Sequence, residues 1–225
     1  AELQDLCLSG DPLRFIQGIK DLNIFWETNQ NFDRLQGALF DGYLQYFEDL
    51  RKKNVPPAPN FQCLTAISEG VGGRRMINHL VQAETQRLGL NGFGERLLVT
   101  ENQPGIGIFN GDVGVVIDSY DFANPRVQFD NIDQPLRRNQ LGVVESAWAI
   151  SIHRSQGSEY PSVFICLPEP TGSRSRFKPS RELLYTALTR AKESVQLFAT
   201  ESMIIEAISR TTHRVTCLDH FLKAS

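Results

Sequence analysis

The chain has 225 residues, 41% of them hydrophobic and 22% charged, and its formal net charge is −3 at pH 7. That length can bury one good core and a small appendage, and the charge does not by itself point to a nucleic-acid-binding protein. Four distant cysteines without a CxxC pair argue against a disulfide scaffold or a zinc site and suit a cytoplasmic protein, and no apolar run is long enough to span a membrane.

The first part of the chain predicts two short helices. Residues Leu3–Leu8 have the pattern of a helix that ends at Gly10. Asp11 followed by Pro12 is typical of a helix cap and the first turn of a second helix.

A long amphipathic helix is predicted over Phe32–Lys53, with Asn31 as its cap, because apolar residues recur there at helical spacing. Three prolines follow it: Pro56, Pro57 and Pro59. Prolines stop a helix and stiffen a linker. We expect residues 1–60 to pack on the sheet domain that follows and not to form an independent fold.

After the linker, Gln62–Ser68 predicts a buried strand and Arg74–Leu88 a helix. Residues 95–145 then change to short strands separated by turn residues. The candidate strands are Leu97–Thr100, Val113–Asp118, Arg126–Asp130 and Gln140–Glu145. This spacing favours a small barrel or meander inserted into an α/β domain, whose pattern resumes at Ala147.

The stretch Ala147–Leu167 predicts two buried strands joined by a polar loop. The loop residues are His153, Arg154, Ser155, Gln156, Gly157, Ser158 and Glu159. A merely solvated connection is the alternative, but such turns are usually built from Gly, Asn, Asp or Pro. Because loops at strand ends of α/β sheets bind ligands, we interpret this one as functional. Ser151, His153 and Ser155 occupy alternate positions, so we expect them to face one direction.

Residues 181–199 predict a helix, a short break and a strand, with Arg190 at the end of the helix. On the pattern alone, Arg190 could be a surface charge that complements the helix dipole. Paired with the polar loop, it is typical of an arginine placed to reach phosphate.

Positive charge is concentrated in residues 172–192. The basic residues there are Arg174, Arg176, Lys178, Arg181, Arg190 and Lys192. A run of like charge is commonly a solvated surface. Beside a phosphate-handling cluster, we favour contact with a nucleic-acid backbone for the loop at 172–181.

Two long segments carry a family resemblance. SIHRSQGSEYPSVFICLP at 151–168, followed by RELLYTALTRAKESVQLFA at 181–199, resembles motifs V and VI of superfamily-one helicases in the form of the RecD branch. NGDVGVVID at 110–118 is similar to the start of the SH3-like insertion of RecD proteins, and FQCLTAISEGVGGRRMIN at 61–78 to their motif IV region. The helical opening, residues 1–53, resembles the stretch after motif III. The resemblance therefore covers essentially the whole chain.

The resemblance implies an α/β fold of a known kind. This is a RecA-like, P-loop-NTPase-type second motor domain that lacks the P-loop itself and carries a small SH3-like β-barrel insertion. The motor domain would comprise residues 61–94 and 146–225, and the barrel residues 95–145. Residues 1–60 would be a helical segment packed on the motor domain.

The chain contains no GxxxxGK[ST] sequence and no acidic pair placed after an apolar strand in the manner of a Walker B element. In the resembled family these parts belong to the first RecA-like domain, which holds the Mg²⁺ that accompanies ATP. The chain also begins at Ala1 without a methionine. We expect it to be the C-terminal half of a larger motor, and to hydrolyse no ATP in isolation.

The resemblance also implies roles for individual residues. Arg190 resembles the catalytic motif VI arginine that reaches the γ-phosphate of ATP, and Gln156, Gly157 and Glu159 would approach the nucleotide. The residues expected to bind nucleic acid are Ser151, His153, Arg154, Ser155, Arg74, Asn78, Arg174, Arg176 and Lys178. No metal ligand is predicted. Ser68 stands where a close RecD relative is expected to have a basic residue.

The implied function is an ATP-dependent 5′-to-3′ DNA helicase or translocase that acts in recombination and double-strand break repair. Its partners would be single-stranded DNA, the other RecA-like domain and, in an exodeoxyribonuclease V alpha subunit, helicase–nuclease subunits. Two alternatives stay open. One is a non-catalytic module that binds nucleic acid or docks on a subunit, and the other is an RNA helicase of the same superfamily.

Overall fold

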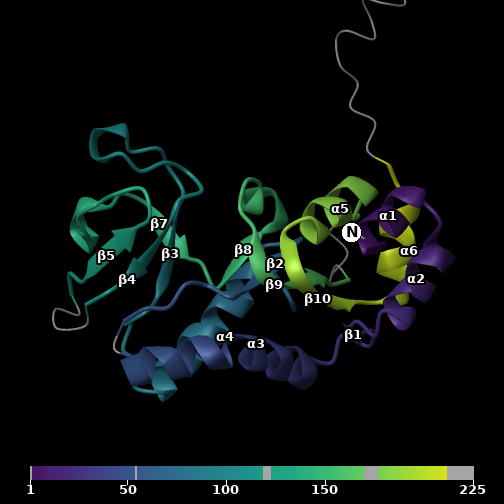
Figure 1. Cartoon of the computed structure of the whole chain (residues 1–225), viewed down its shortest axis with the longest axis horizontal. Helices are drawn as coiled ribbons and strands as arrows, with labels where there is room; N and C mark the ends of the chain where they lie inside the picture. Colours follow the sequence, from purple (N-terminus) through teal and green to yellow (C-terminus); the bar gives the residue numbers. More distant parts are fainter. Residues whose placement is uncertain (1, 54, 119–122, 170–176, 212–225) are drawn as a thin grey trace, which may run out of the picture.

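The computed structural model describes residues 2–53, 55–118, 123–169 and 177–211. They form two five-stranded sheets, one entirely parallel and one entirely antiparallel, which lie side by side in Figure 1. Figure 1 also shows α3 and α4 running beneath the parallel sheet. The α/β class expected from the sequence is confirmed.

The parallel sheet has the strand order β1–β10–β9–β2–β8. These strands are β1 (Trp26–Glu27), β10 (Ala191–Ala199), β9 (Tyr160–Leu167), β2 (Phe61–Thr65) and β8 (Ala149–Ser151). All residues of β2 are buried, as are six of the eight in β9. Such continuous burial is typical of parallel strands that are covered on both faces.

Helices cover both faces of this sheet. The first layer is α1 (Glu2–Ser9), α2 (Pro12–Asp21), α5 (Arg181–Leu188) and α6 (Glu201–Ser209), and the second is α3 (Phe32–Lys53) and α4 (Arg74–Arg87). Neighbouring residues of one strand enter different cores: Leu64 packs under the first layer and Cys63 under the second. This is the alternation that a strand imposes on its side chains. Within the described residues, no helix has the length and apolarity needed to cross a membrane.

The predicted caps of α2 and α3 are confirmed. The Asp11 carboxylate accepts hydrogen bonds from the backbone N–H groups of Leu13 at 3.0 Å and Arg14 at 3.2 Å. The Asn31 side-chain oxygen accepts from Arg34 N at 3.1 Å. Each cap satisfies backbone donors that the first helical turn leaves open.

Two elements of the parallel domain were not predicted. The strand β1 is only two residues long, and its Trp26 Nε1 donates to the backbone oxygen of Ala199 at 2.8 Å. The helix α6 starts at a Thr200 cap, whose hydroxyl accepts from Met203 N at 3.3 Å. Residues 1–60 thus supply an edge strand as well as helices to the parallel domain.

The antiparallel sheet has the order β6–β5–β4–β3–β7. Its strands are β3 (Arg96–Val99), β4 (Val113–Val116), β5 (Arg126–Phe129), β6 (Leu136–Arg137) and β7 (Val144–Ser146). It has a separate core of seven buried residues: Leu97, Val99, Ile108, Val116, Val127, Phe129 and Leu141. In sequence, the unit lies between α4 and β8.

The predicted strand Gln140–Glu145 is wrong in its first half. Residues Arg138–Gln140 form the 3₁₀ helix η2, and the strand begins only at Val144. Gln140 closes this turn, because its side-chain oxygen accepts from Arg137 N at 2.6 Å. Two other 3₁₀ helices are η1 (Pro104–Ile106) and η3 (Ile152–Ser155).

Candidate functional site

The polar loop connects the side of the parallel sheet where its strands end to the side where its strands begin. It leaves the carboxyl end of β8, forms η3, and then enters the amino end of β9 at Tyr160. Because β8 and β9 both run parallel to β2, the segment must return along the sheet from one edge to the other. The predicted site residues therefore fall into two groups, one near each edge.

Arg190 defines the group at the amino edge of β9 and β10. Its Nη1 donates to the backbone oxygen of Ser158 at 3.1 Å, and the backbone oxygen of Arg190 accepts from Tyr160 N at 2.8 Å. Its Nε and Nη2 donate to Thr186 O at 3.2 Å and to the Thr189 hydroxyl at 3.0 Å. A guanidinium has five N–H donors, so two remain for an anion. The structure brings Arg190 to the loop that sequence analysis paired with it.

Glu159 and Gly157 belong to the same group. The Glu159 carboxylate forms an ion pair with Lys192 at 3.3 Å, and both side chains are more than half exposed. Gly157 has a φ of +89°, which favours glycine, although a Cβ there would meet no atom within 4 Å. Its role is therefore conformational, not steric. Gln156 is exposed beside it.

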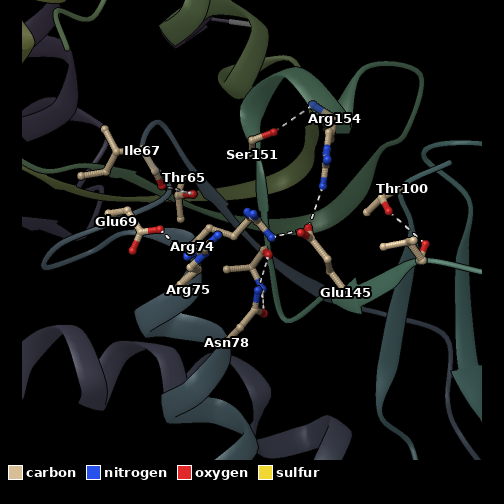
Figure 2. A network of polar contacts seen from close by, with 12 residues as sticks. Thr65, Ile67, Glu69, Arg74, Arg75, Asn78, Thr100, Glu145, Ser151 and Arg154 are labelled. Carbon is tan, nitrogen blue, oxygen red and sulfur yellow. Dashed lines mark hydrogen bonds and ion pairs between the residues drawn. The ribbon is translucent and has the colours of Figure 1, made fainter. Parts of the chain in front are cut away.

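The second group centres on a carboxylate of the antiparallel sheet, Glu145 in β7 (Figure 2). One oxygen of Glu145, Oε2, accepts from Arg74 Nη1 at 2.5 Å and from Arg154 Nη1 at 2.9 Å. Arg74 is the first residue of α4, and Arg154 lies in η3. A single carboxylate thus holds together two arginines that were predicted to contact nucleic acid.

The charges in this cluster are strongly coupled. Burial alone would raise the pKa of Glu145, but hydrogen bonds from Arg154 and Arg74 and their positive charges hold that pKa below its ordinary value. Glu145 is therefore ionised at neutral pH. With two arginines and one carboxylate, the cluster carries one net positive charge.

Ser151 and His153 lie at the same end of the loop. The Ser151 hydroxyl accepts from Arg154 N at 3.4 Å and so caps η3. The side chain of His153 is exposed. Arg154 is linked to Ser151 by this hydrogen bond and, through Glu145, to Arg74, whose side chain is 11% exposed. We call Ser151, His153, Arg154 and Arg74 the arginine edge.

The predicted common orientation of Ser151, His153 and Ser155 is wrong. The chain turns into η3 after Ser151, so strand alternation does not continue through the loop. Ser155 is fully buried, and its hydroxyl donates to Ile152 O at 2.7 Å. This side chain is not available to nucleic acid.

Asn78 is also engaged inside the protein. Its side-chain oxygen accepts from Ala149 N at 2.7 Å, and its Nδ2 donates to Ala149 O at 3.0 Å, as Figure 2 shows. Both polar groups of the amide therefore pair with the backbone of the edge strand β8. The residue is 7% exposed and these hydrogen bonds are structural, so the contact of Asn78 with nucleic acid stays a prediction.

The remaining basic candidates do not join either group. Lys178 pairs with Glu206 of α6 at 3.4 Å, and its backbone oxygen accepts from Arg210 at 3.3 Å. Arg174 and Arg176 lie outside the described residues. Where residues are described, no group of three or more His, Cys, Asp or Glu side chains is placed to hold a metal ion.

Sequence reasoning missed two charged partners, Glu145 and Lys192. Glu145 is the one acidic residue between Asp133 and Glu159, and it directly precedes the buried stretch that leads into β8. That isolation was a usable signal, because a lone charge beside a core segment usually has a partner. Lys192 was noted only as part of a basic run.

Comparisons with known proteins agree with the family resemblance. Residues 146–198 match the model of the UvrD-like helicase C-terminal domain. The RecBCD enzyme subunit RecD of Mycobacterium tuberculosis (strain CDC 1551) is 39% identical over 130 residues, which is 56% of this chain and 21% of that protein. RecD of Haemophilus influenzae is 29% identical over 206 residues, 80% of this chain and 30% of that protein.

A third relative is the ATP-dependent RecD2 DNA helicase of Deinococcus radiodurans, 35% identical over 100 residues. That match covers 44% of this chain and 13% of that protein. The chain is therefore similar in sequence to RecD-type helicases. It spans less than a third of the length of these relatives.

Proposed function

We propose that this chain is the C-terminal motor part of an ATP-dependent DNA helicase of the RecD family. The intact protein would move 5′ to 3′ along single-stranded DNA and act in recombination and double-strand break repair. The observation that carries the proposal is the hydrogen bond from Arg190 to Ser158, because it joins the motif VI arginine to the motif V loop. The names of the RecD and RecD2 relatives support the class of enzyme.

The finer fold assignment follows the same proposal. The parallel sheet with helices on both faces would be the second RecA-like motor domain, formed by residues 61–94 and 146–225. The antiparallel unit at 95–145 would be the SH3-like barrel, and residues 1–60 a helical segment packed on the motor domain. The separate core of the antiparallel unit supports its treatment as an insertion.

ATP with Mg²⁺ would bind between this domain and the other motor domain, which would hold the metal. Arg190 would direct its two uncommitted N–H donors to the γ-phosphate and stabilise the charge that develops during phosphoryl transfer. Glu159 would accept from the ribose hydroxyls, beside the backbone of Gln156 and Gly157. Lys192, which pairs with Glu159, adds a second positive charge beside Arg190.

Single-stranded DNA would lie along the arginine edge. Arg74 and Arg154 would contact backbone phosphates, with Ser151 and His153 beside them. Residues 152–159 join the arginine edge to the Arg190 group. Closure of the two motor domains around ATP would therefore change how the arginine edge contacts the DNA. For a RecBCD-type protein, helicase–nuclease subunits would be further partners.

The test is an Arg190→Ala substitution in the intact protein that contains this chain. DNA-stimulated ATP hydrolysis should fall by roughly 10³-fold or more, as for other arginine fingers. Binding of single-stranded DNA, measured by fluorescence anisotropy, should change less than twofold. Arg87→Ala is the matched control, because Arg87 is an exposed arginine whose side chain pairs with Glu84 on α4. Retention of more than a third of the ATPase rate would overturn the assignment.

The isolated chain gives an independent check. It should hydrolyse no ATP above an Arg190→Ala version of itself, because it has no phosphate-binding loop sequence. Hydrolysis that depends on Arg190 in the isolated chain would contradict the proposal that the other motor domain is needed for ATP hydrolysis.

A further inference from the structure

Arg190 is the single residue between Thr189, which caps the end of α5, and the first residue of β10. Its backbone is held on both sides, because its N–H donates to Ala187 O at 3.1 Å and its oxygen accepts from Tyr160 N at 2.8 Å. A long arginine side chain on such a fixed backbone still has many rotamers. The groups that hold the guanidinium therefore decide how well it is aligned with a bound phosphate.

Three acceptors hold the guanidinium of Arg190, one for each of its nitrogen atoms. Two of them are backbone oxygens: Thr186 O accepts from Nε at 3.2 Å, and Ser158 O accepts from Nη1 at 3.1 Å. The third is the hydroxyl of Thr189, which accepts from Nη2 at 3.0 Å. Among the described residues, it is the only side-chain group that accepts a hydrogen bond from Arg190. A backbone oxygen is present in every residue type, so only the Thr189 contact depends on the identity of a side chain.

The Thr189 hydroxyl is itself held in the orientation that this contact needs. It donates its hydrogen to Thr186 O at 2.9 Å. A hydroxyl has one donor and two acceptor lone pairs, so the group that faces Arg190 is an acceptor. The Thr186 oxygen, the Thr189 hydroxyl and the Arg190 guanidinium thus form a closed ring of hydrogen bonds. Two bonds from one guanidinium to this ring fix its plane better than a single bond would.

These three bonds leave one free N–H on Nη1 of Arg190 and one on Nη2. We propose that Thr189 is a positioning residue, whose hydroxyl orients the guanidinium so that these two donors face the γ-phosphate of ATP. Without the hydroxyl, fewer closed complexes would have the guanidinium aligned when the charge of the transition state develops. The inference rests on the proposed function, because it needs Arg190 to act on ATP.

Thr189→Val in the intact protein that contains this chain tests the inference. Valine keeps the shape of threonine but has no hydroxyl, so the kcat of DNA-stimulated ATP hydrolysis should fall by roughly 10–100-fold, as for the loss of a hydrogen bond to a charged group. Thr189→Ser keeps the hydroxyl and should stay within threefold of the wild-type kcat. The affinity for fluorescent ADP should change less than twofold in both variants, because ADP has no γ-phosphate.

Thr85→Val is the matched control. The Thr85 hydroxyl donates to Gln82 O at 2.8 Å, which is the same bond to a carbonyl three residues earlier that Thr189 makes. Thr85 lies on α4, which covers the other face of the parallel sheet, so its variant should keep the wild-type kcat within twofold. Thr189→Ala is a second variant without the hydroxyl, in case valine at this position impairs folding. Thermal unfolding of each intact variant shows whether it is folded.

The double variant Thr189→Val/Arg190→Ala separates the inference from the proposed function. Its kcat should lie within twofold of that of Arg190→Ala, because Thr189 acts through Arg190. A further fall, or equal losses in Thr189→Val and Thr189→Ser, would overturn the inference. So would a Thr189→Val protein that keeps more than a tenth of the wild-type kcat while Arg190→Ala is inactive, and the proposed function would then stand. An Arg190→Ala protein with unchanged kcat would overturn both.

Discussion

Glu145 joins two arginines that come from different elements, and its charge sets what the arginine edge offers to a ligand. Both ion pairs use the same oxygen, so the two guanidinium groups are held close together despite their like charge. A phosphate that approaches them must share or replace this carboxylate. The residue therefore lowers the affinity of the free edge for anions while it keeps the arginines in place.

Glu145→Gln should accordingly strengthen binding of single-stranded DNA at low salt. The amide keeps an acceptor for the arginines but removes one negative charge, so the slope of log K against log salt should steepen by about 0.7. Fluorescence titrations of the chain with an oligothymidylate over a salt series measure both quantities. Glu84→Gln is the matched control, because Glu84 pairs with exposed Arg87 on the same helix as Arg74. Weaker binding by Glu145→Gln would show that the carboxylate acts only to position the arginines.

At the scale of single residues, the sequence predicted the chemistry of the side chains better than their orientation. Arg190 and its loop were paired correctly, since both motifs are long and have a fixed order. Ser155 and Asn78 were predicted to bind nucleic acid, but both side chains are buried. A polar residue that faces a backbone carbonyl leaves no pattern in the sequence, because the partner is common to every residue type.

At the scale of elements, periodicity and caps predicted the helices well. The bounds of α3 match the predicted Phe32–Lys53, because its apolar stripe, its cap and the prolines after it agree. The two-residue strands β1 and β6 were missed, since alternation cannot be read from so short a run. Their pairing with β10 and β5 is set by tertiary contacts alone.

Strand β1 should be held largely by one buried carboxylate. Glu27 is 1% exposed and accepts from Arg34 at 2.9 Å and from Asn29 N at 2.9 Å. Burial would raise its pKa, but these hydrogen bonds hold the pKa below the ordinary 4.5. Glu27→Gln should lower the free energy of unfolding at pH 7 by about 1–2 kcal/mol.

The stability that Glu27→Gln loses should depend on pH in a predictable direction. A carboxyl with a depressed pKa contributes stability above pH 4.5, and the contribution disappears as pH falls through the folded-state value. The free energy of unfolding, measured with urea, should therefore differ less between the wild type and Glu27→Gln below pH 4.5. A free-energy difference that stays constant between pH 7 and pH 4 would show that folding does not lower the pKa of Glu27.

Asn78→Ala separates a structural from a nucleic-acid role. The variant loses two buried hydrogen bonds to β8, so its free energy of unfolding should fall by about 2–3 kcal/mol. The affinity of the folded protein for single-stranded DNA should stay within twofold of the wild type. Urea unfolding and anisotropy titration measure the two effects. An affinity loss of tenfold or more with unchanged stability would restore the nucleic-acid role.

At the scale of the whole molecule, the layers come from segments distant in sequence. The parallel core needs residues 1–60 on both faces and at one edge, so this opening is part of the domain. The sequence predicted that residues 1–60 pack on the sheet, but not that they cover both of its faces and one of its edges. Which face a helix covers is decided by strand order, and strand order in a parallel sheet has no local signal.

The edge strand β8 has a further consequence for how copies of the chain behave at high concentration. A free strand edge invites another chain to add a strand, which leads to aggregation. Here the N–H and C=O of Ala149 are already occupied by the Asn78 amide. An incoming strand would have to displace that side chain before it could pair. Asn78 thus occupies the backbone groups of Ala149 that an added strand would need, at the strand that leads into the polar loop.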